Sequence, residues 1–278
     1  MLIDVHNQQA YCYTGGKPFD PSLPVVVLIH GAQNDHSVWA LQSRSLAHAG
    51  FAVLAPDLPG HGRSGGAALT SVEAMADWLL ALLDAAGVAR AVLAGHSMGS
   101  LIALEAAARA PERVSGLGLV GTTYPMRVAD ALLATARDDE PSAIEMVASW
   151  SHSAWLPGPS TAGPGTSVVN VARRLMQRMS ARNPAGLFHT DFAACNAYAN
   201  GEAAAAGLTC PVTFVLGKKD MMTPPRSTAL LTGAIKQGKI VYVDAGHAMM
   251  AEAPDAVRAA LLDLARAATS HSADQVSC

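Results

Sequence analysis

Short, continuous apolar runs that alternate with helix-length segments constrain the fold of this chain more than any other feature of its sequence. The run VVVLI at residues 25–29 has no polar residue, and VTFVL at residues 212–216 has only one. Uninterrupted runs of this length are typical of strands that are buried on both faces. Separated by helices, such strands predict an α/β fold with a mostly parallel sheet and helices on both faces.

The same pattern places the elements along the chain. The predicted strands are residues 25–29, 51–55, 91–94, 114–120, 212–216 and 240–243. The predicted helices of this part are residues 39–49, 72–86, 98–109, 226–234 and 255–268. Ser71 is expected to cap the second helix, and Gly87 is expected to end it.

The alternation stops between residues 122 and 207, which contain no convincing strand. Helical pieces are predicted at residues 129–137, 143–149 and 168–179, with a turn-rich segment at residues 156–167. Because the sheet pattern resumes afterwards, we predict that residues 122–207 are a helical cap inserted into one core. That core comprises residues 1–121 and 208–268, and the small polar residues 269–278 are predicted to form a disordered tail.

Composition narrows the class of protein. Half of the 278 residues are apolar and 15% are charged, which excludes an intrinsically disordered chain. The net charge is −3 and Lys and Arg form no run, so we expect neither a nucleic-acid partner nor a membrane partner. A small-molecule substrate is the expected partner. The low charge and the apolar cap are compatible with a homodimer but do not require one.

The cysteines and the absent motifs bear on cofactors and location. The four cysteines form no CxxC pair and no cluster with histidine, which argues against a structural zinc site and a disulfide scaffold. With no dinucleotide-binding GxGxxG unit and no P-loop, we expect no cofactor and no metal. The first residues lack the features of a signal peptide, and we predict a cytoplasmic location.

The sharpest chemical signal is Gly95-His96-Ser97-Met98-Gly99, which joins a predicted strand to a predicted helix. In this context GxSxG predicts a nucleophile elbow, a sharp turn that exposes the serine hydroxyl. The glycines are needed because a Cβ atom two residues before or after the serine would clash. The serine then lies at a helix N-terminus, where backbone amides favour developing negative charge.

A serine hydroxyl needs a base and an acid to act as a nucleophile. Asp220 follows the strand at 212–216, and His247 follows the strand at 240–243. Ser97, Asp220 and His247 therefore stand on loops at the carboxyl ends of parallel strands, where ligands bind in open α/β sheets. Asp244 is a rival acid, but it lies only three residues before His247.

An oxyanion hole is expected from two backbone N–H groups, those of Ala32 and Met98. Met98 follows the nucleophile, and Ala32 follows the turn at Gly31 after the first buried strand. His30 is expected to be a structural hydrogen-bonding residue under that loop. His96 is expected to pack at the elbow without a catalytic role.

These residues together resemble the α/β-hydrolase superfamily. Four further segments carry the resemblance: His30-Gly31, DLPGHGRS at residues 57–64, Pro211 before VTFVLGKKD at residues 212–220, and AGHAMMAEAPDAV at residues 245–257. The resemblance implies an eight-stranded, mostly parallel sheet whose second strand is antiparallel, with residues 2–13 supplying the first two strands. Haloalkane dehalogenases and epoxide hydrolases of this fold carry aspartate at the elbow, so Ser97 argues against both activities.

The cap would close over Ser97 and determine specificity. Candidate pocket residues are His30, Trp39, Trp150, Trp155, Phe192, Tyr198 and Met221, although packing alone is expected to explain at least half of the aromatic ones. We favour a carboxylesterase acting on small apolar esters through an acyl-enzyme. The same catalytic groups would serve a carbon–carbon bond hydrolase, a lactonase or a cofactor-free perhydrolase. A ligand-binding protein with vestigial turnover is a third hypothesis, against which an intact triad argues.

Overall fold

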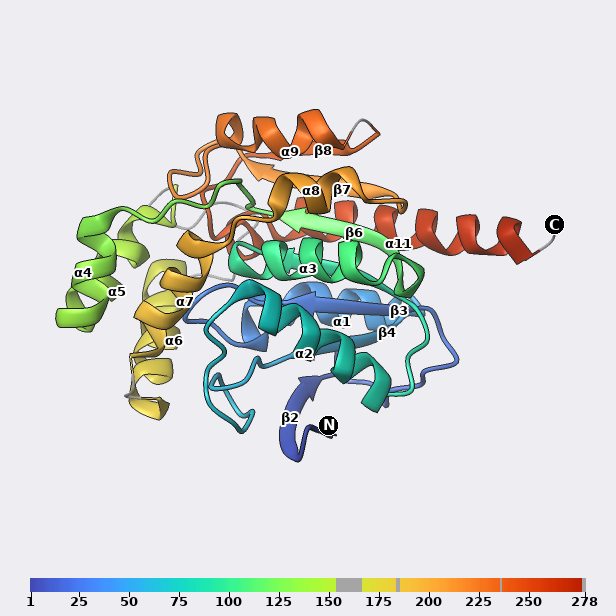
Figure 1. Ribbon diagram of the computed structural model, residues 1–278, viewed down its shortest axis with the longest axis horizontal. Helices are drawn as coiled ribbons and strands as arrows, with labels where there is room; N and C mark the ends of the chain where they lie inside the picture. The colour runs from blue at the N-terminus through green and yellow to red at the C-terminus, as the bar shows by residue number, and fades with distance from the viewer. Residues whose placement is uncertain (154–166, 184–185, 236, 277–278) are drawn as a thin grey trace.

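The computed structural model describes residues 1–153, 167–183, 186–235 and 237–276, and eight strands of this part form one sheet (Figure 1). The strands are β1 (Leu2–Val5), β2 (Gln8–Tyr13), β3 (Val25–Ile29), β4 (Ala52–Pro56), β5 (Ala91–His96), β6 (Val114–Val120), β7 (Val212–Gly217) and β8 (Lys239–Val243). Their order is β1-β2-β4-β3-β5-β6-β7-β8. Strand β2 is antiparallel to both neighbours, and all other pairs are parallel. The predicted fold class is confirmed.

The central strands are buried on both faces because helices cover each side of the sheet. Along β3, Val25, Val27 and Ile29 belong to one core, and Val26 and Leu28 belong to the other. Figure 1 shows α2 (Val72–Ala85) and α3 (Met98–Arg109) in front of the sheet, with α1 (Ala40–His48) and α11 (Pro254–Val276) behind it. The strand-length apolar runs are thus explained by burial on both sides.

The ends of α2 lie where the sequence predicts them. The Ser71 hydroxyl accepts a hydrogen bond from the Ala74 N–H at 3.1 Å, and Gly87 has a left-handed φ of +68°. The predicted start of the helix at Trp39 is displaced, because a short 3-10 turn, η1 (His36–Trp39), precedes α1.

The C-terminal helix is longer than predicted. Helix α11 continues to Val276, so the stretch predicted as a disordered tail is helical as far as that residue, and residues 277–278 lie outside the described part. No glycine or proline follows Ala268 to end the helix. The hydroxyl of Thr269 donates to the carbonyl oxygen of Ala265 at 2.8 Å, so its polar group finds a partner on the preceding turn of the helix.

Four helices between β6 and β7 form a cap at the end of the sheet toward which β3 and β6 point (Figure 1). They are α4 (Asp130–Asp138), α5 (Glu140–Trp150), α6 (Val168–Arg182) and α7 (Leu187–Ala197). Helix α7 was not predicted. The predicted turn-rich segment lies outside the described residues, except for its last residue, Ser167, which caps α6.

The last helix of the predicted cap segment packs on the helices that cover the sheet. Helix α8 (Gly201–Ala206) packs against α3 and α9 (Ala229–Ala234), and its Ala204 and Ala205 belong to the main core. Its alanine-rich sequence suits close packing against α3, so it completes a helical layer of the sheet. The remaining short elements are η2 (Pro111–Arg113), η3 (Pro225–Thr228) and α10 (Met249–Glu252).

The cysteines and the helices of the described part bear on disulfides and on membrane spans. Cys12, Cys195 and Cys210 are free thiols. Across the described ranges, no helix combines the length and the hydropathy that crossing a membrane requires.

Candidate active site

Ser97 occupies a strained turn between β5 and α3. Its φ is +53° and its ψ is −120°, a conformation that non-glycine residues rarely adopt. A Cβ atom on Gly95 would collide with the carbonyl group of Gly99, and one on Gly99 would collide with the carbonyl oxygens of Ile29 and His30. The two glycines therefore allow the elbow to form and let it pack against the end of β3.

Asp220 and His247 form a buried hydrogen-bonded pair. Oδ2 of Asp220 accepts a hydrogen bond from Nδ1 of His247 at 2.8 Å, and both side chains are nearly inaccessible to solvent. Oδ2 also accepts a bond from the Thr223 hydroxyl at 2.7 Å, and Oδ1 accepts bonds from the N–H groups of Met222 and Thr223. Burial raises the pKa of Asp220, but the His247 ring and these donors outweigh it and hold the pKa below its usual range.

The rival acid, Asp244, is not beside His247. Its carboxylate forms an exposed ion pair with Nζ of Lys219 at 2.9 Å. The loops after β7 and β8 thus direct Asp220 toward the imidazole and Asp244 toward solvent. Thr223, which bonds to the Asp220 carboxylate and lies 3.1 Å from Nδ1 of His247, was not identified from the sequence.

Ser97 and His247 line two neighbouring cavities, of about 250 and 210 Å³. Phe192 and Met222 also line both of them. No hydrogen bond joins Ser97 to His247 among the described residues. A long contact between nucleophile and base is common before substrate binds, because such bonds shorten in the complex.

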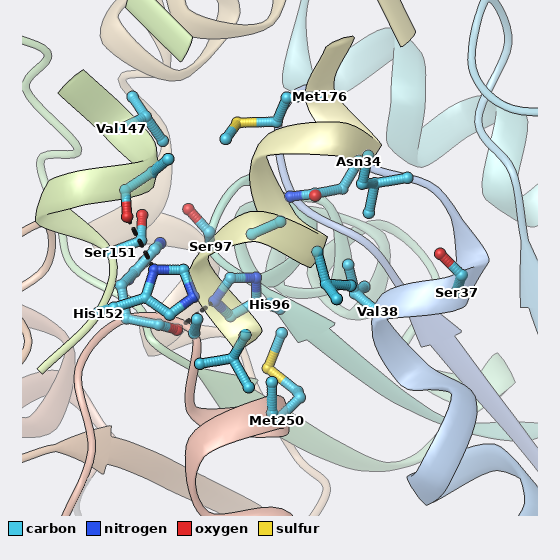
Figure 2. Close-up of a pocket in the computed structure, with 18 of the residues that line it drawn as sticks. Asn34, Ser37, Val38, His96, Ser97, Val147, Ser151, His152, Met176 and Met250 are labelled. Carbon is cyan, nitrogen blue, oxygen red and sulfur yellow. Dashed lines mark hydrogen bonds between the residues drawn. The ribbon is translucent and has the colours of Figure 1, made fainter. Parts of the chain in front are cut away.

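The larger cavity is lined mainly by apolar side chains from the cap and from the loops after β3 and β8. They include Val38, Leu41, Val147, Val168, Leu175, Met176 and Met250. Figure 2 shows Val147 and Met176 on one side of Ser97, and Val38 and Met250 on others. An uncharged, apolar group is the complement of these walls.

The loop after β3 lies against the elbow. A Cβ atom on Gly31 would lie 3.2 Å from Cβ of Ser97, and Ala32 lines the larger cavity together with Ser97. The Ala32 N–H has no acceptor within the part of the chain that the structure describes. The Met98 N–H, at the first position of α3, has no partner within its helix. Both expected donors therefore lie next to Ser97 with their N–H groups unused.

His96 is packed beneath the pair of Asp220 and His247. Its Nε2–H donates to the carbonyl oxygen of His247 at 2.9 Å, and the two rings are 4.6 Å apart between centroids (Figure 2 shows this bond). Burial, and then the neighbouring His247, lower the pKa of His96 to about 3. A neutral His96 thus supports the backbone of His247.

Three predicted pocket residues do not line the pocket. Trp39 is completely buried in the core and meets His96 edge-on. Tyr198 is buried with its hydroxyl donating to Glu105 at 2.8 Å. His30 is buried as well, accepting a hydrogen bond from the Leu58 N–H at 3.1 Å and donating to the Gly31 carbonyl at 2.9 Å. All three assignments were wrong because packing beneath the loops uses the same residue types as a pocket wall.

Three others do border the cavities. Phe192 lines both, and Trp150 and Met221 line the smaller one. Met221 is 73% exposed, so it lies at the rim. Trp155 lies outside the described residues.

A second buried pair of histidine and aspartate joins the cap to the core. Oδ2 of Asp191, on α7, accepts a hydrogen bond from Nε2 of His61 at 2.9 Å, and both side chains are almost fully buried. The other ring nitrogen, Nδ1, lies 3.0 Å from the carbonyl oxygen of Pro59. Both nitrogens of His61 face acceptors, an arrangement that favours the doubly protonated, cationic ring. Burial lowers the pKa of His61, but Asp191 outweighs it, and the net pKa is raised.

The raised pKa of His61 predicts a pH-dependent stability. A group whose pKa is raised by folding adds stability that is fully present below its unfolded-state pKa, about 6.5, and that is lost as the pH rises through the folded-state value. We expect the difference in unfolding free energy between the wild type and His61→Asn to be largest at pH 6 and to shrink toward alkaline pH. The neighbouring His30, with a pKa of about 4, stays neutral in this range.

Urea denaturation at several pH values between 6 and 9 measures this difference. A difference that stays constant over the range would contradict a cationic His61.

Known proteins share sequence features with this chain. A family model described as alpha/beta hydrolase fold matches residues 24–254. Lipase LipV of Mycobacterium tuberculosis is 35% identical over 142 residues, which cover 49% of this chain and 50% of the lipase. The dihydrolipoyllysine-residue acetyltransferase component of the acetoin cleaving system from Pseudomonas putida is 42% identical over 98 residues, 35% of this chain and 26% of that protein. The matches thus span half or less of these relatives.

Solved structures resemble the whole described fold. A thermophilic esterase from Thermogutta terrifontis superposes with a TM-score of 0.78 and 24% identity, covering 96% of this chain and 98% of the esterase. An enol-lactonase from Burkholderia xenovorans LB400 superposes with a TM-score of 0.75 and 23% identity, covering 95% and 99%. At these identities the likeness shows a shared fold.

Proposed function

Because this chain belongs to the alpha/beta hydrolase fold family, we propose that it is a hydrolase that uses Ser97 as nucleophile, His247 as general base and Asp220 as the acid that orients His247. The observation that carries the proposal is the 2.8 Å bond between Asp220 and His247, beside a cavity that Ser97 also lines. The strained backbone at Ser97 supports it, since strain of this kind is kept where function requires it.

The proposed reaction has two halves. Oγ of Ser97 attacks the acyl carbon and passes its proton to Nε2 of His247, while the N–H groups of Ala32 and Met98 stabilise the oxyanion. The carbonyl then re-forms, the bond to the leaving alcohol breaks, and His247 gives the alcohol its proton. Water, activated by His247, hydrolyses the acyl-enzyme in the same way. No cofactor takes part in this scheme.

We propose small apolar carboxylic esters as the substrates. The apolar walls of the larger cavity favour an uncharged acyl or alcohol group, and the partial relative named as a lipase agrees with ester chemistry. Lactones, carbon–carbon bonds of diketones, and perhydrolysis are the alternatives on the same three residues. A panel of these substrates distinguishes them, and faster turnover of charged esters than of neutral ones would contradict an apolar site. A cytoplasmic location is part of the proposal.

Covalent labelling tests the nucleophile. Incubation with a fluorophosphonate is expected to add one adduct per chain, detected by intact mass, because an activated serine attacks the phosphorus centre and displaces fluoride. Ser97→Ala is expected to give no adduct while melting within a few degrees of the wild type. A folded wild type without an adduct would favour the ligand-binding hypothesis, and an adduct that persists in Ser97→Ala would place the reactive serine elsewhere.

A further inference from the structure

The cap holds the loop that carries the proposed oxyanion donor Ala32. We propose that Asp191, on α7 of the cap, is a positioning residue for this loop, so that Ser97 reacts at its full rate only while the cap is docked. The inference rests on the proposed function, in which the Ala32 N–H stabilises the oxyanion. Asp191 has Gln33 and His61 as its hydrogen-bond partners, whereas Asp220 and His247 bond to each other.

The contact is direct and buried. Oδ2 of Asp191 accepts a hydrogen bond from the Gln33 backbone N–H at 2.8 Å and the bond from His61 described above. Gln33 and Asp191 have no measurable solvent exposure. Gln33 immediately follows Ala32, so a carboxylate of the cap holds the peptide group next to the proposed oxyanion donor.

Two other cap helices hold the same residue by its side chain. Nε2 of Gln33 carries two protons: it donates to the Glu140 carboxylate on α5 at 2.8 Å, and on α6 it has two acceptors that share one proton, the Ser180 hydroxyl at 2.9 Å and the Met176 carbonyl at 3.2 Å. Gln33 is thus bonded to α5, α6 and α7 together. These bonds therefore fix the position of Gln33 relative to the cap.

The backbone of Gln33 explains why these bonds affect the loop. Its φ is +57°, a strained conformation for a residue with a side chain, which persists only when the surroundings hold it. The loop is anchored on one side by β3 and on the other by η1, whose cap residue is Asp35. With both ends fixed, relaxation of Gln33 must rotate the neighbouring peptide groups, including the one that carries the Ala32 N–H.

The charge on His61 strengthens the contact. An imidazolium paired with Asp191 in a buried site makes removal of either partner costly, because the other charge would stay buried without compensation. The pair therefore disfavours arrangements in which α7 has moved away from the loop.

Asp191→Asn tests the inference because it keeps the shape of the side chain and removes the charge. We expect kcat for a short-chain ester to fall roughly 10- to 100-fold, less than the loss of a whole oxyanion donor, with KM within about threefold. The affinity for an alkyl boronic acid, whose tetrahedral adduct places an oxygen in the oxyanion hole, is expected to fall in parallel. Fluorophosphonate labelling is expected to be slower and still to reach one adduct per chain.

Glu105→Gln is the matched control. Glu105 is a buried carboxylate on α3 that accepts hydrogen bonds from Tyr198 and Asn200, away from the oxyanion loop. We expect it to lower the melting temperature, as Asp191→Asn does, and to leave kcat and boronic acid affinity within about twofold. A purely structural role for Asp191 would make the two variants alike.

The outcomes separate the inference from the proposed function. If the wild type is active and folded Asp191→Asn matches its kcat and boronic acid affinity, the inference is overturned alone. A wild type that neither labels nor hydrolyses esters overturns the proposed function and the inference with it. If Asp191→Asn does not fold, Glu140→Gln tests the same loop from a partly exposed side chain: a fall in kcat of about fivefold at constant KM supports the inference, and an unchanged kcat overturns it.

Discussion

Replacing Asp220 with Asn is expected to lower kcat for a short-chain ester by roughly 10⁴-fold, with KM within about threefold. Nδ1 of His247 donates to the Asp220 carboxylate, which leaves Nε2 free for the proposed proton transfer from Ser97. An amide in that position no longer stabilises the imidazolium and also favours the wrong tautomer of His247. Steady-state kinetics with a chromogenic ester, on a preparation free of endogenous esterase, measures the effect.

Asp244→Asn provides the control from the same loop as His247. Its carboxylate pairs with Lys219 at the surface, so we expect kcat to stay within about twofold of the wild type. Equal losses in the two variants would argue against Asp220 as the orienting acid. A large loss of kcat in Asp244→Asn alone would mean that Asp244, and not Asp220, is the orienting acid.

Replacing Gly99 with Ala is expected to lower the free energy of unfolding by about 3 kcal/mol or more and to abolish labelling of Ser97. The added methyl group would meet the carbonyl oxygens of Ile29 and His30. These are backbone atoms at the end of β3, a strand paired with β4 and β5, so they cannot move aside as a flexible side chain would. Urea denaturation followed by tryptophan fluorescence measures the stability.

Gly233→Ala is the matched substitution without a clash. Gly233 is exposed in α9, and a Cβ atom there meets nothing within 4 Å. Alanine has the higher helix propensity, so this variant is expected to gain about 0.5–1 kcal/mol. A Gly99→Ala variant as stable as the wild type, with normal labelling, would mean that the elbow tolerates a side chain at this position.

Much of the fold follows from local patterns. The apolar run of β3 faces a core on each side, and Ser71 caps α2 as its position suggests. Each of these features depends on the types and spacing of a few neighbouring residues, and these can be read from the sequence. The end of α11 was misjudged because small polar residues neither favour nor end a helix when no glycine or proline is present.

The cap was harder to predict because its helices are determined by what they pack against. Helix α7 contains His189, Thr190 and Asp191 among its apolar residues, so its pattern is weak, yet Asp191 and Phe188 are both buried there. Helix α8 reads as part of the cap until its packing on α3 assigns it to the core. Trp39 and Tyr198 have the residue types of a pocket wall, and they pack inside the protein.

The positions of the three proposed catalytic residues were predictable from their neighbours in the sequence. Ser97, Asp220 and His247 each follow an apolar run, and parallel strands bring their carboxyl ends to one edge of the sheet. The folded chain was needed to show which aspartate meets His247, which aromatic residues face the cavities, and that Asp191 reaches the loop of Ala32. The physical reason is that a strand end is recognised from neighbouring residues. The direction of a loop side chain, by contrast, depends on partners from other loops and helices, 27 residues away for His247 and Asp220 and 158 residues away for Gln33 and Asp191.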